Sequence, residues 1–167
     1  MPNDEAEQTR LNILHQMYLL LLPAATPHSP AFSLTLAPLP ASPTHILDIG
    51  TGTGEWAINI AELFPSCTVT GTDISAIQPS AVPSNVFFEI DDAEHPGDWT
   101  FSHPHDLIHI RNLAGGFRNW PGVYREAYRH LKPGGWIEVG DADHATTALA
   151  AGGEVQRLAE AVREATL

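Results

Sequence analysis

Short apolar runs alternate with segments of helical periodicity from residue 45 onward. Each run has the length and the flanking turn residues of a buried strand. We predict strands at His45–Ile49, 68–72, Val86–Ile90, 106–110 and 136–139. Helices are predicted at 55–64, ended by Pro65, and at 121–131, before a type II turn at Lys132-Pro133-Gly134-Gly135. Strands that alternate with helices predict a doubly wound α/β fold with a parallel sheet.

A separate helix is predicted ahead of this region, at residues 3–22. Apolar residues at three- and four-residue spacing would lie on one of its faces: Leu11, Leu14, Tyr18 and Leu22. Residues 23–43 are rich in proline and predict an irregular connector. We therefore divide the chain into an N-terminal helix and connector, 1–43, and a cofactor-binding domain, 44–167. Its last segment, 152–167, predicts one helix rich in alanine and glutamate.

The strongest signal for function follows the first predicted strand. Asp48 closes that strand, and Gly50, Gly52 and Gly54 follow at alternate positions before a helix begins. A backbone that turns sharply beneath a ligand needs residues without Cβ, both for its dihedral angles and for close approach. An ordinary strand-to-helix turn rarely needs three such glycines. The pattern therefore predicts a nucleotide-cofactor loop.

The glycines alone leave the cofactor open. Residues 52–57 fit the dinucleotide fingerprint G-x-G-x-x-A, and Asp73 lies where a ribose-binding acid is expected. S-adenosylmethionine (SAM) fits the same loop. Asp48 favours SAM, because a carboxylate here would repel a pyrophosphate but attract the ammonium and sulfonium groups of SAM.

Polar residues follow the ends of four predicted strands. They are Asp48, Asp73, Asp91, Asp92, Arg111 and Asn112. In an open parallel sheet the ligand binds beyond the carboxyl ends of the strands, near the point where strand order reverses. We therefore expect these side chains to surround one ligand site.

Composition excludes several partners. The chain has 167 residues and a formal net charge of −12, and it offers no basic stripe for nucleic acid or an anionic membrane. The apolar run 17–22 is too short to span a bilayer, and no basic signal-peptide segment precedes it. The single cysteine, Cys67, excludes an intramolecular disulfide and fits a reducing compartment. We predict a cytoplasmic or nuclear protein without nucleic-acid or membrane partners.

Several motifs along the chain resemble those of a known family. These motifs are residues 48–57 (DIGTGTGEWA), 71–75 (GTDIS) with 77–79 (IQP), 88–93 (FEIDDA), 109–113 (HIRNL) and 131–138 (LKPGGWIE). Their order and spacing are similar to those of class I SAM-dependent methyltransferases, and more narrowly to the fungal LaeA-like methyltransferases of secondary metabolism. The resemblance covers about residues 5–143. It implies a Rossmann-like fold, SAM as cofactor, and methyl transfer to a small molecule or a protein.

The resemblance also implies roles for individual residues. The three glycines would let the backbone pass under the methionine part of SAM, and Asp48 would face its amino-acid end. Asp73 would accept hydrogen bonds from both ribose hydroxyls.

Around the adenine, Ile74 would pack on the ring and Asp92 would meet the amino group, with the Ala93 backbone at the ring edge. Asp91 is either a further contact or a solvated acid at a strand end. Arg111 and Asn112 would line the reacting end of the cofactor.

Methyl transfer asks the protein mainly to align the reactants, because the sulfonium is already activated. A general base helps when the acceptor must lose a proton, and we single out His144, after the last predicted strand, as a catalytic candidate. His109 lies within a strand and is more typical of a core histidine. His103, His105 and His109 lack the spacing of a metal site, so we expect no metal.

The chain also departs from the family. Room for the sixth and seventh strands of a class I methyltransferase sheet is absent, so strand 136–139 would form an unprotected edge. The chain is then a fragment, a domain completed by a second copy or another chain, or a protein that no longer methylates. We predict a homodimer through this edge.

Three functions stay open beside one another. The first is a methyltransferase for a small-molecule or protein acceptor. The second is a non-methylating regulatory or binding module that acts with a partner or as a dimer. The third is a repurposed natural-product enzyme in which SAM acts electrostatically. A NAD-dependent dehydrogenase is a fourth, but it does not explain Asp91-Asp92-Ala93 or the Lys132-Pro133-Gly134-Gly135 turn.

Overall fold

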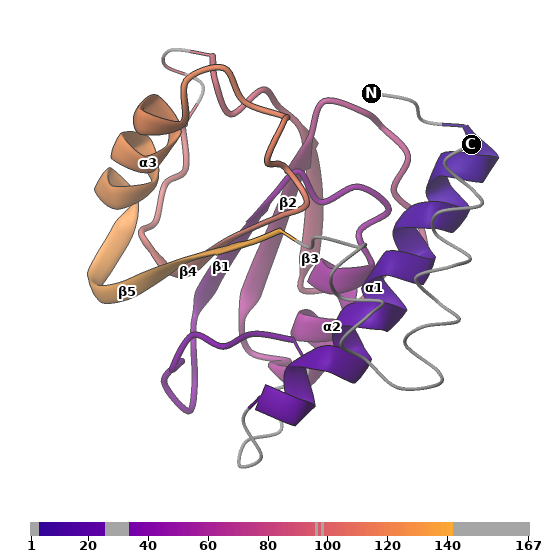
Figure 1. Cartoon of the computed structure of the whole chain (residues 1–167). Coiled ribbons are helices and arrows are strands. Elements are labelled where there is room, and N and C mark those ends of the chain that lie inside the picture. The colour runs from indigo at the N-terminus through magenta and orange to yellow at the C-terminus, as the bar shows by residue number, and fades with distance from the viewer. Residues whose placement is uncertain (1–3, 26–33, 96, 98, 142–167) are drawn as a thin grey trace. The chain divides into compact units, whose positions relative to one another are not determined.

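The computed structural model describes residues 4–25, 34–95, 97 and 99–141 (Figure 1). The chain divides into two compact units, one made of Met1–Leu36 with Ala142–Leu167 and one made of Ala37–Asp141. His144 and the helix predicted at 152–167 lie outside the described residues.

The unit Ala37–Asp141 holds one parallel sheet. Its strands are β1 (His45–Ile49), β2 (Thr68–Asp73), β3 (Val86–Ile90), β4 (His105–Arg111) and β5 (Leu131–Gly140). They lie in the order β3-β2-β1-β4-β5, and every neighbouring pair is parallel. Strand order reverses between β1 and β4, which is where the polar strand ends were expected to meet. The predicted α/β fold is confirmed.

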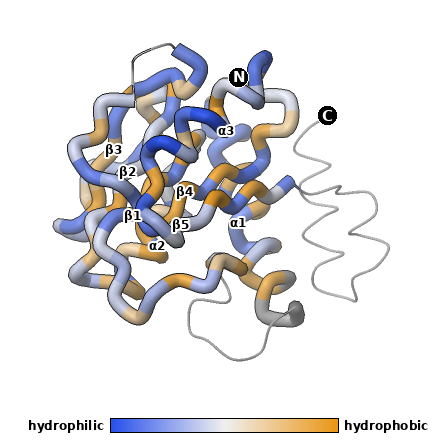
Figure 2. Tube along the Cα trace, turned by 90° about the vertical axis from the view of Figure 1, so that its left-hand side faces the viewer, coloured by the Kyte–Doolittle hydropathy of each residue, from blue (hydrophilic) through white to orange (hydrophobic). Residues whose placement is uncertain are grey.

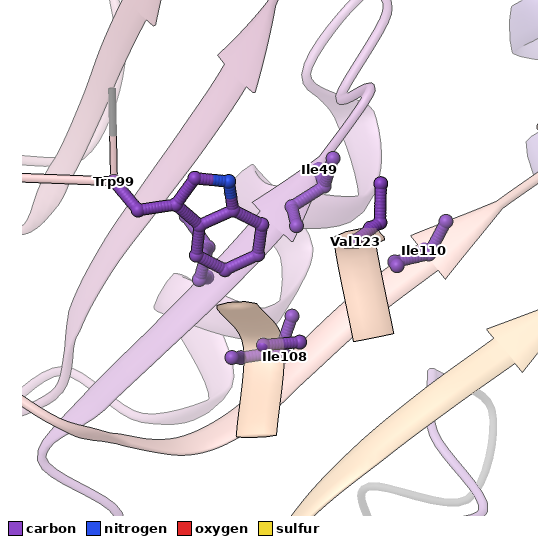
Figure 3. Close-up of a cluster of buried hydrophobic side chains, with 7 residues drawn as sticks. Ile49, Trp99, Ile108, Ile110 and Val123 are labelled. Atoms are coloured by element: carbon purple, nitrogen blue, oxygen red, sulfur yellow. The ribbon is translucent and has the colours of Figure 1, made fainter. Parts of the chain in front are cut away.

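Helices α2 (Glu55–Leu63) and α3 (Trp120–Arg129) cover opposite faces of this sheet (Figure 1). Alternate strand residues point to opposite faces. The face toward α3 carries a hydrophobic core that includes Ile49, Ile108 and Ile110 of the strands and Val123 of the helix, with Trp99 beside them (Figure 3). Figure 2 colours the chain by hydropathy and shows hydrophobic (orange) and hydrophilic (blue) stretches alternating along it. The sheet is therefore doubly wound.

Helix α2 begins directly after the glycine segment. Gly54 is its N-cap, and Trp56, Ala57, Ile60 and Ala61 are its buried residues. The helix ends one residue earlier than predicted, because Phe64 has left the helical conformation (φ −122°). Pro65 explains this end, since a residue before proline is pushed out of the helical region.

The connection from α3 to β5 differs from the prediction. Helix α3 ends at Arg129 rather than at residue 131, and β5 begins at Leu131, five residues early. Residues 132–135 form an irregularity within β5: Leu131 pairs with His105, and Trp136 already pairs with Leu107. Gly134 has φ +83°, the conformation that a type II turn requires at its third residue. The turn therefore forms inside a strand, because β4 offers a partner on both sides of it.

In the other unit, helix α1 (Glu5–Ala25) is capped by Asp4, whose Oδ1 accepts a hydrogen bond from Glu7 N at 2.9 Å. The helix runs past Pro23, although the sequence predicted an end at residue 22. A proline in the last turn removes one hydrogen bond where few remain to be lost. No helix among the described residues is both long and apolar enough to cross a membrane.

Candidate cofactor site

The glycine loop between β1 and α2 has the backbone conformation that its sequence predicted. Gly50, Gly52 and Gly54 have φ of +69°, +58° and +81°. All three lie in the left-handed region that other residues adopt only with strain. The loop is tied to β2, because the N–H groups of Gly50 and Thr51 both donate to Thr72 O, at 2.8 and 2.9 Å.

Neighbouring side chains press on the loop so closely that a Cβ would collide with them. A Cβ on Gly50 would lie 2.4 Å from Leu113 Cδ1, and one on Gly54 would lie 2.4 Å from Phe88 Cζ. Phe88 also lies 2.8 Å from the position of a Cβ on Gly71 of β2. Conformation therefore requires glycine at all three loop positions, and at Gly54 the ring of Phe88 also leaves no space for a Cβ.

Asp73, at the carboxyl end of β2, faces this loop. Its Oδ2 accepts a hydrogen bond from Gly52 N at 2.8 Å, and its Oδ1 accepts one from Ser75 N at 2.9 Å. An ionised carboxylate can accept about four hydrogen bonds, so capacity remains for two hydroxyl donors. Asp73 is partly exposed, as a ligand contact requires. Its position fits a ribose-binding acid.

Asp48, at the end of β1, is buried beneath the loop. Its Oδ2 accepts a hydrogen bond from Thr51 Oγ1 at 2.6 Å, and its Oδ1 lies 2.7 Å from His109 Nδ1. Both oxygens are already engaged by the protein. That Asp48 also faces the amino-acid end of a cofactor stays a prediction.

The loops after β2 and β3 place the predicted adenine contacts near one another in the fold. Ile74 is 60% exposed, an unusual position for a large apolar side chain and one that suits packing on a ring. Asp91 N donates to Asp73 O at 3.0 Å, which joins the ends of β2 and β3. Asp92 is exposed, and its Oδ1 accepts from Glu94 N at 3.0 Å. Ala93 O accepts from Trp99 Nε1 at 3.0 Å.

Arg111 and Asn112 follow at the end of β4. Asn112 has φ +59°, the left-handed region, and it is the one non-glycine with positive φ in the described part of the chain. Its N–H donates to Gly140 O of β5 at 2.9 Å. Strain of this kind concentrates at functional sites.

Sequence reasoning gave no role to three residues that shape the loop. Gln78 donates from Nε2 to Gly52 O at 2.7 Å and to Ser75 O at 2.9 Å, so it joins the glycine loop to the segment after β2. His109 contacts both flanks of the loop, Asp48 before it and Trp56 after it. All three residues lie in motifs that carry the resemblance, so those motifs could have found them, but the contact of His109 with Asp48 depends on strand register.

Polar groups away from the loop serve the fold. Burial opposes ionisation of Asp106, but hydrogen bonds from Lys132, Thr44 N and His45 N outweigh it and lower the pKa of Asp106. Burial raises the pKa of Cys67 to about 12, so this thiol is not a nucleophile at neutral pH. In the described ranges no three His, Cys, Asp or Glu side chains are grouped to hold a metal ion.

Comparison with known proteins identifies the class. The methyltransferase domain family matches residues 25–164, so the chain belongs to that family. Among solved structures, the plantazolicin methyltransferase BpumL in complex with S-adenosylhomocysteine (SAH) aligns with a TM-score of 0.56 at 18% identity. The alignment covers 96% of this chain and 59% of the BpumL chain. The fold is the class I, SAM-dependent methyltransferase fold, as predicted.

The curated relatives reported next are fungal proteins. Methyltransferase PytC of Aspergillus terreus is 45% identical over 139 residues, which is 83% of this chain and 40% of the relative. The protein-methionine methyltransferase LaeA of Emericella nidulans is 38% identical over 145 residues, 86% of this chain and 36% of the relative. The predicted resemblance to LaeA-like methyltransferases is confirmed. The chain spans about two fifths of the length of these relatives.

Proposed function

We propose that this chain is a SAM-dependent methyltransferase that acts on a small-molecule acceptor of fungal secondary metabolism or on a protein. One observation carries the proposal: the carboxylate of Asp73 faces three left-handed glycines at the carboxyl end of the sheet. This arrangement supports a ligand that presents two ribose hydroxyls to the acid and passes close to the glycine backbone.

The charge around the loop supports SAM rather than a dinucleotide. Acids end β1, β2 and β3 (Asp48, Asp73, Asp91 and Asp92), and no basic side chain ends these strands. A pyrophosphate would be repelled by this set, whereas a cation would be attracted. The family to which the chain belongs favours the same choice.

The cofactor supplies an activated methyl group on a sulfonium, and the protein supplies position. Gly50, Gly52 and Gly54 allow close approach of the backbone, and Asp73 fixes the ribose. Ile74 offers an apolar surface to the base. Arg111 and Asn112 lie where strand β4 leaves the sheet, beside the expected reacting end. Correct alignment of donor and acceptor accounts for most of what such an enzyme must do.

The acceptor and its base belong to the same proposal. The relatives include a protein-methionine methyltransferase, which supports a protein acceptor, and regulators of secondary metabolism, which supports a role in that metabolism. His144 is our candidate base for an acceptor that must lose a proton. We further propose a cytoplasmic or nuclear location, and a homodimer through the β5 edge. The competing function is a regulatory module that binds SAM without turnover.

Calorimetric titration of the full chain with SAM and with S-adenosylhomocysteine tests the proposal. We expect micromolar binding of both. Asp73→Asn should weaken binding at least about a hundredfold, because a hydrogen-bonded charged group is lost at a partly buried site. The control is Glu62→Gln, the same loss of charge on the exposed face of α2.

Absence of binding by the folded wild-type chain would overturn the proposal. Binding that Asp73→Asn leaves unchanged would overturn the site. Binding without transfer to any acceptor, small molecule or protein, would favour the regulatory module.

A further inference from the structure

One buried side chain contacts both flanks of the glycine loop. His109 of β4 is 3% exposed. Its Nδ1 lies 2.7 Å from Asp48 Oδ1, and its ring stacks on Trp56 with centroids 3.7 Å apart and planes within 3°. Asp48 precedes the loop and Trp56 follows it, so a single imidazole joins the two ends.

Strand register produces this arrangement. Asp48 and His109 are direct partners across β1 and β4, and in-register residues of a parallel pair leave the same face of the sheet. Helix α2 covers that face and places Trp56 in its first turn. The imidazole is therefore held between the last polar residue of β1 and the first buried residue of α2.

The contact also reaches the inside of the loop. Asp48 is buried, and a buried carboxylate is costly unless its oxygens are hydrogen-bonded. His109 serves one oxygen and Thr51 Oγ1 serves the other. Thr51 lies between Gly50 and Gly52, so a change at His109 is passed through Asp48 to the glycines themselves.

We propose that His109 is a positioning residue for the cofactor loop, acting through Asp48 and Trp56 without touching the cofactor. It fixes the direction in which the chain leaves β1 and the direction in which α2 begins. Its effect on cofactor affinity rests on the proposed function, whereas its effect on the loop does not.

Two substitutions separate the two contacts. His109→Asn keeps a donor close to the position of Nδ1 and removes the stacked ring. His109→Phe keeps a ring for Trp56 and leaves Asp48 Oδ1 without its donor. The matched control is His105→Asn. His105 lies in the same strand, is equally buried, and has its Nδ1 3.1 Å from His130 O, at the end of β4 away from the loop.

The first measurement is amide hydrogen exchange by NMR in the chain without cofactor. The amides of Gly50, Gly52 and Gly54 are hydrogen-bonded to Thr72, Asp73 and Thr51. Relative to the amides of β4, we expect exchange at these glycines to rise about tenfold or more in His109→Phe, and less in His109→Asn. In His105→Asn, the exchange rates of the loop glycines and of the β4 amides should change by the same factor. The proposal would be overturned if the ratio of loop exchange to β4 exchange were equal in all three variants.

The second measurement is the dissociation constant of S-adenosylhomocysteine. We expect it to weaken about tenfold or more in His109→Phe and to stay unchanged in His105→Asn. If His109→Phe does not fold, the two measurements are made on His109→Asn instead, and an effect no larger than that of His105→Asn would overturn the proposal. If the wild-type chain binds no cofactor, the proposed function fails, while exchange at the glycines still tests the role of His109.

Discussion

Gly54 and Gly134 have almost the same positive φ but different surroundings. Their φ values are +81° and +83°. A Cβ on Gly54 would lie 2.4 Å from Phe88 Cζ, whereas a Cβ on Gly134 would meet no atom within 4 Å. The pair therefore separates the cost of a strained backbone from the cost of a collision.

We expect Gly134→Ala to lower the free energy of unfolding by about 1–2 kcal/mol, the cost of a left-handed alanine. Gly54→Ala should lower it by about 1–3 kcal/mol more, because the added methyl must displace a ring in a packed site. Urea unfolding measures both. The double variant Gly54→Ala with Phe88→Leu should show less than the sum of its two single effects. Equal losses for the two glycines would contradict the collision.

At this scale the sequence predicted which residues form the loop but not which residues press on it. Alternate glycines after an apolar run specify the loop by themselves, because the cause is local. Leu113, two residues after the end of β4, and Phe88 of β3 press on it from tens of residues away along the chain. His109 was interpreted as a core histidine, and it is buried, but its contact with Asp48 follows from register.

Between elements, His105 joins the start of β4 to the end of α3. Its backbone N donates to His130 O at 2.8 Å, and its Nδ1 lies 3.1 Å from the same oxygen. Burial lowers the pKa of His105 from 6.5 to about 4, although the hydrogen bond to His130 partly opposes this effect. The neutral imidazole is therefore part of the native packing.

This pKa predicts an acid-sensitive stability. Between pH 6.5 and about 4 the unfolded chain binds a proton at His105 and the folded chain does not, so stability rises with pH across this window. The contribution is complete above pH 6.5 and is lost as the pH falls toward 4. A pKa difference of roughly 2.5 corresponds to about 3 kcal/mol at most.

Urea unfolding of the wild type and of His105→Asn at several pH values measures this effect. The free energy of unfolding of the wild type should be higher than that of the variant, and this difference should shrink as the pH falls from 6.5 to 4. A constant difference over that range would show that His105 is not held neutral.

The elements themselves were predicted with two instructive errors. Local patterns gave the five strands and the helices between them, because strand and helix periods differ clearly. The start of β5 and the end of α1 were wrong. In β5, pairing with β4 overrides the preference of residues 132–135 for a turn between elements. In α1, a single proline near the end removes only one backbone hydrogen bond, which is not enough to stop the helix.

For the whole molecule, the outer strands of the sheet decide how copies could associate. In the described part of the chain β5 pairs with β4 alone and β3 pairs with β2 alone. Large apolar side chains are exposed at both edges: Trp136 at 48% and Val139 at 38% on β5, and Phe87 at 51% on β3. Exposed edges of this kind favour pairing between chains.

We predict that two copies associate through β5. Light scattering with size-exclusion chromatography should give a dimer mass for the wild type. Val139→Lys should shift it to the monomer, because a charge on a strand edge opposes pairing. Phe87→Lys, the matched change on β3, should remain dimeric. A monomeric wild type would contradict the prediction, and dissociation by Phe87→Lys alone would move the interface to β3. The two edges differ for the cofactor as well: Phe87 neighbours Phe88, which presses on the glycine loop, so a dimer through β5 leaves Phe88 and its contact with that loop undisturbed.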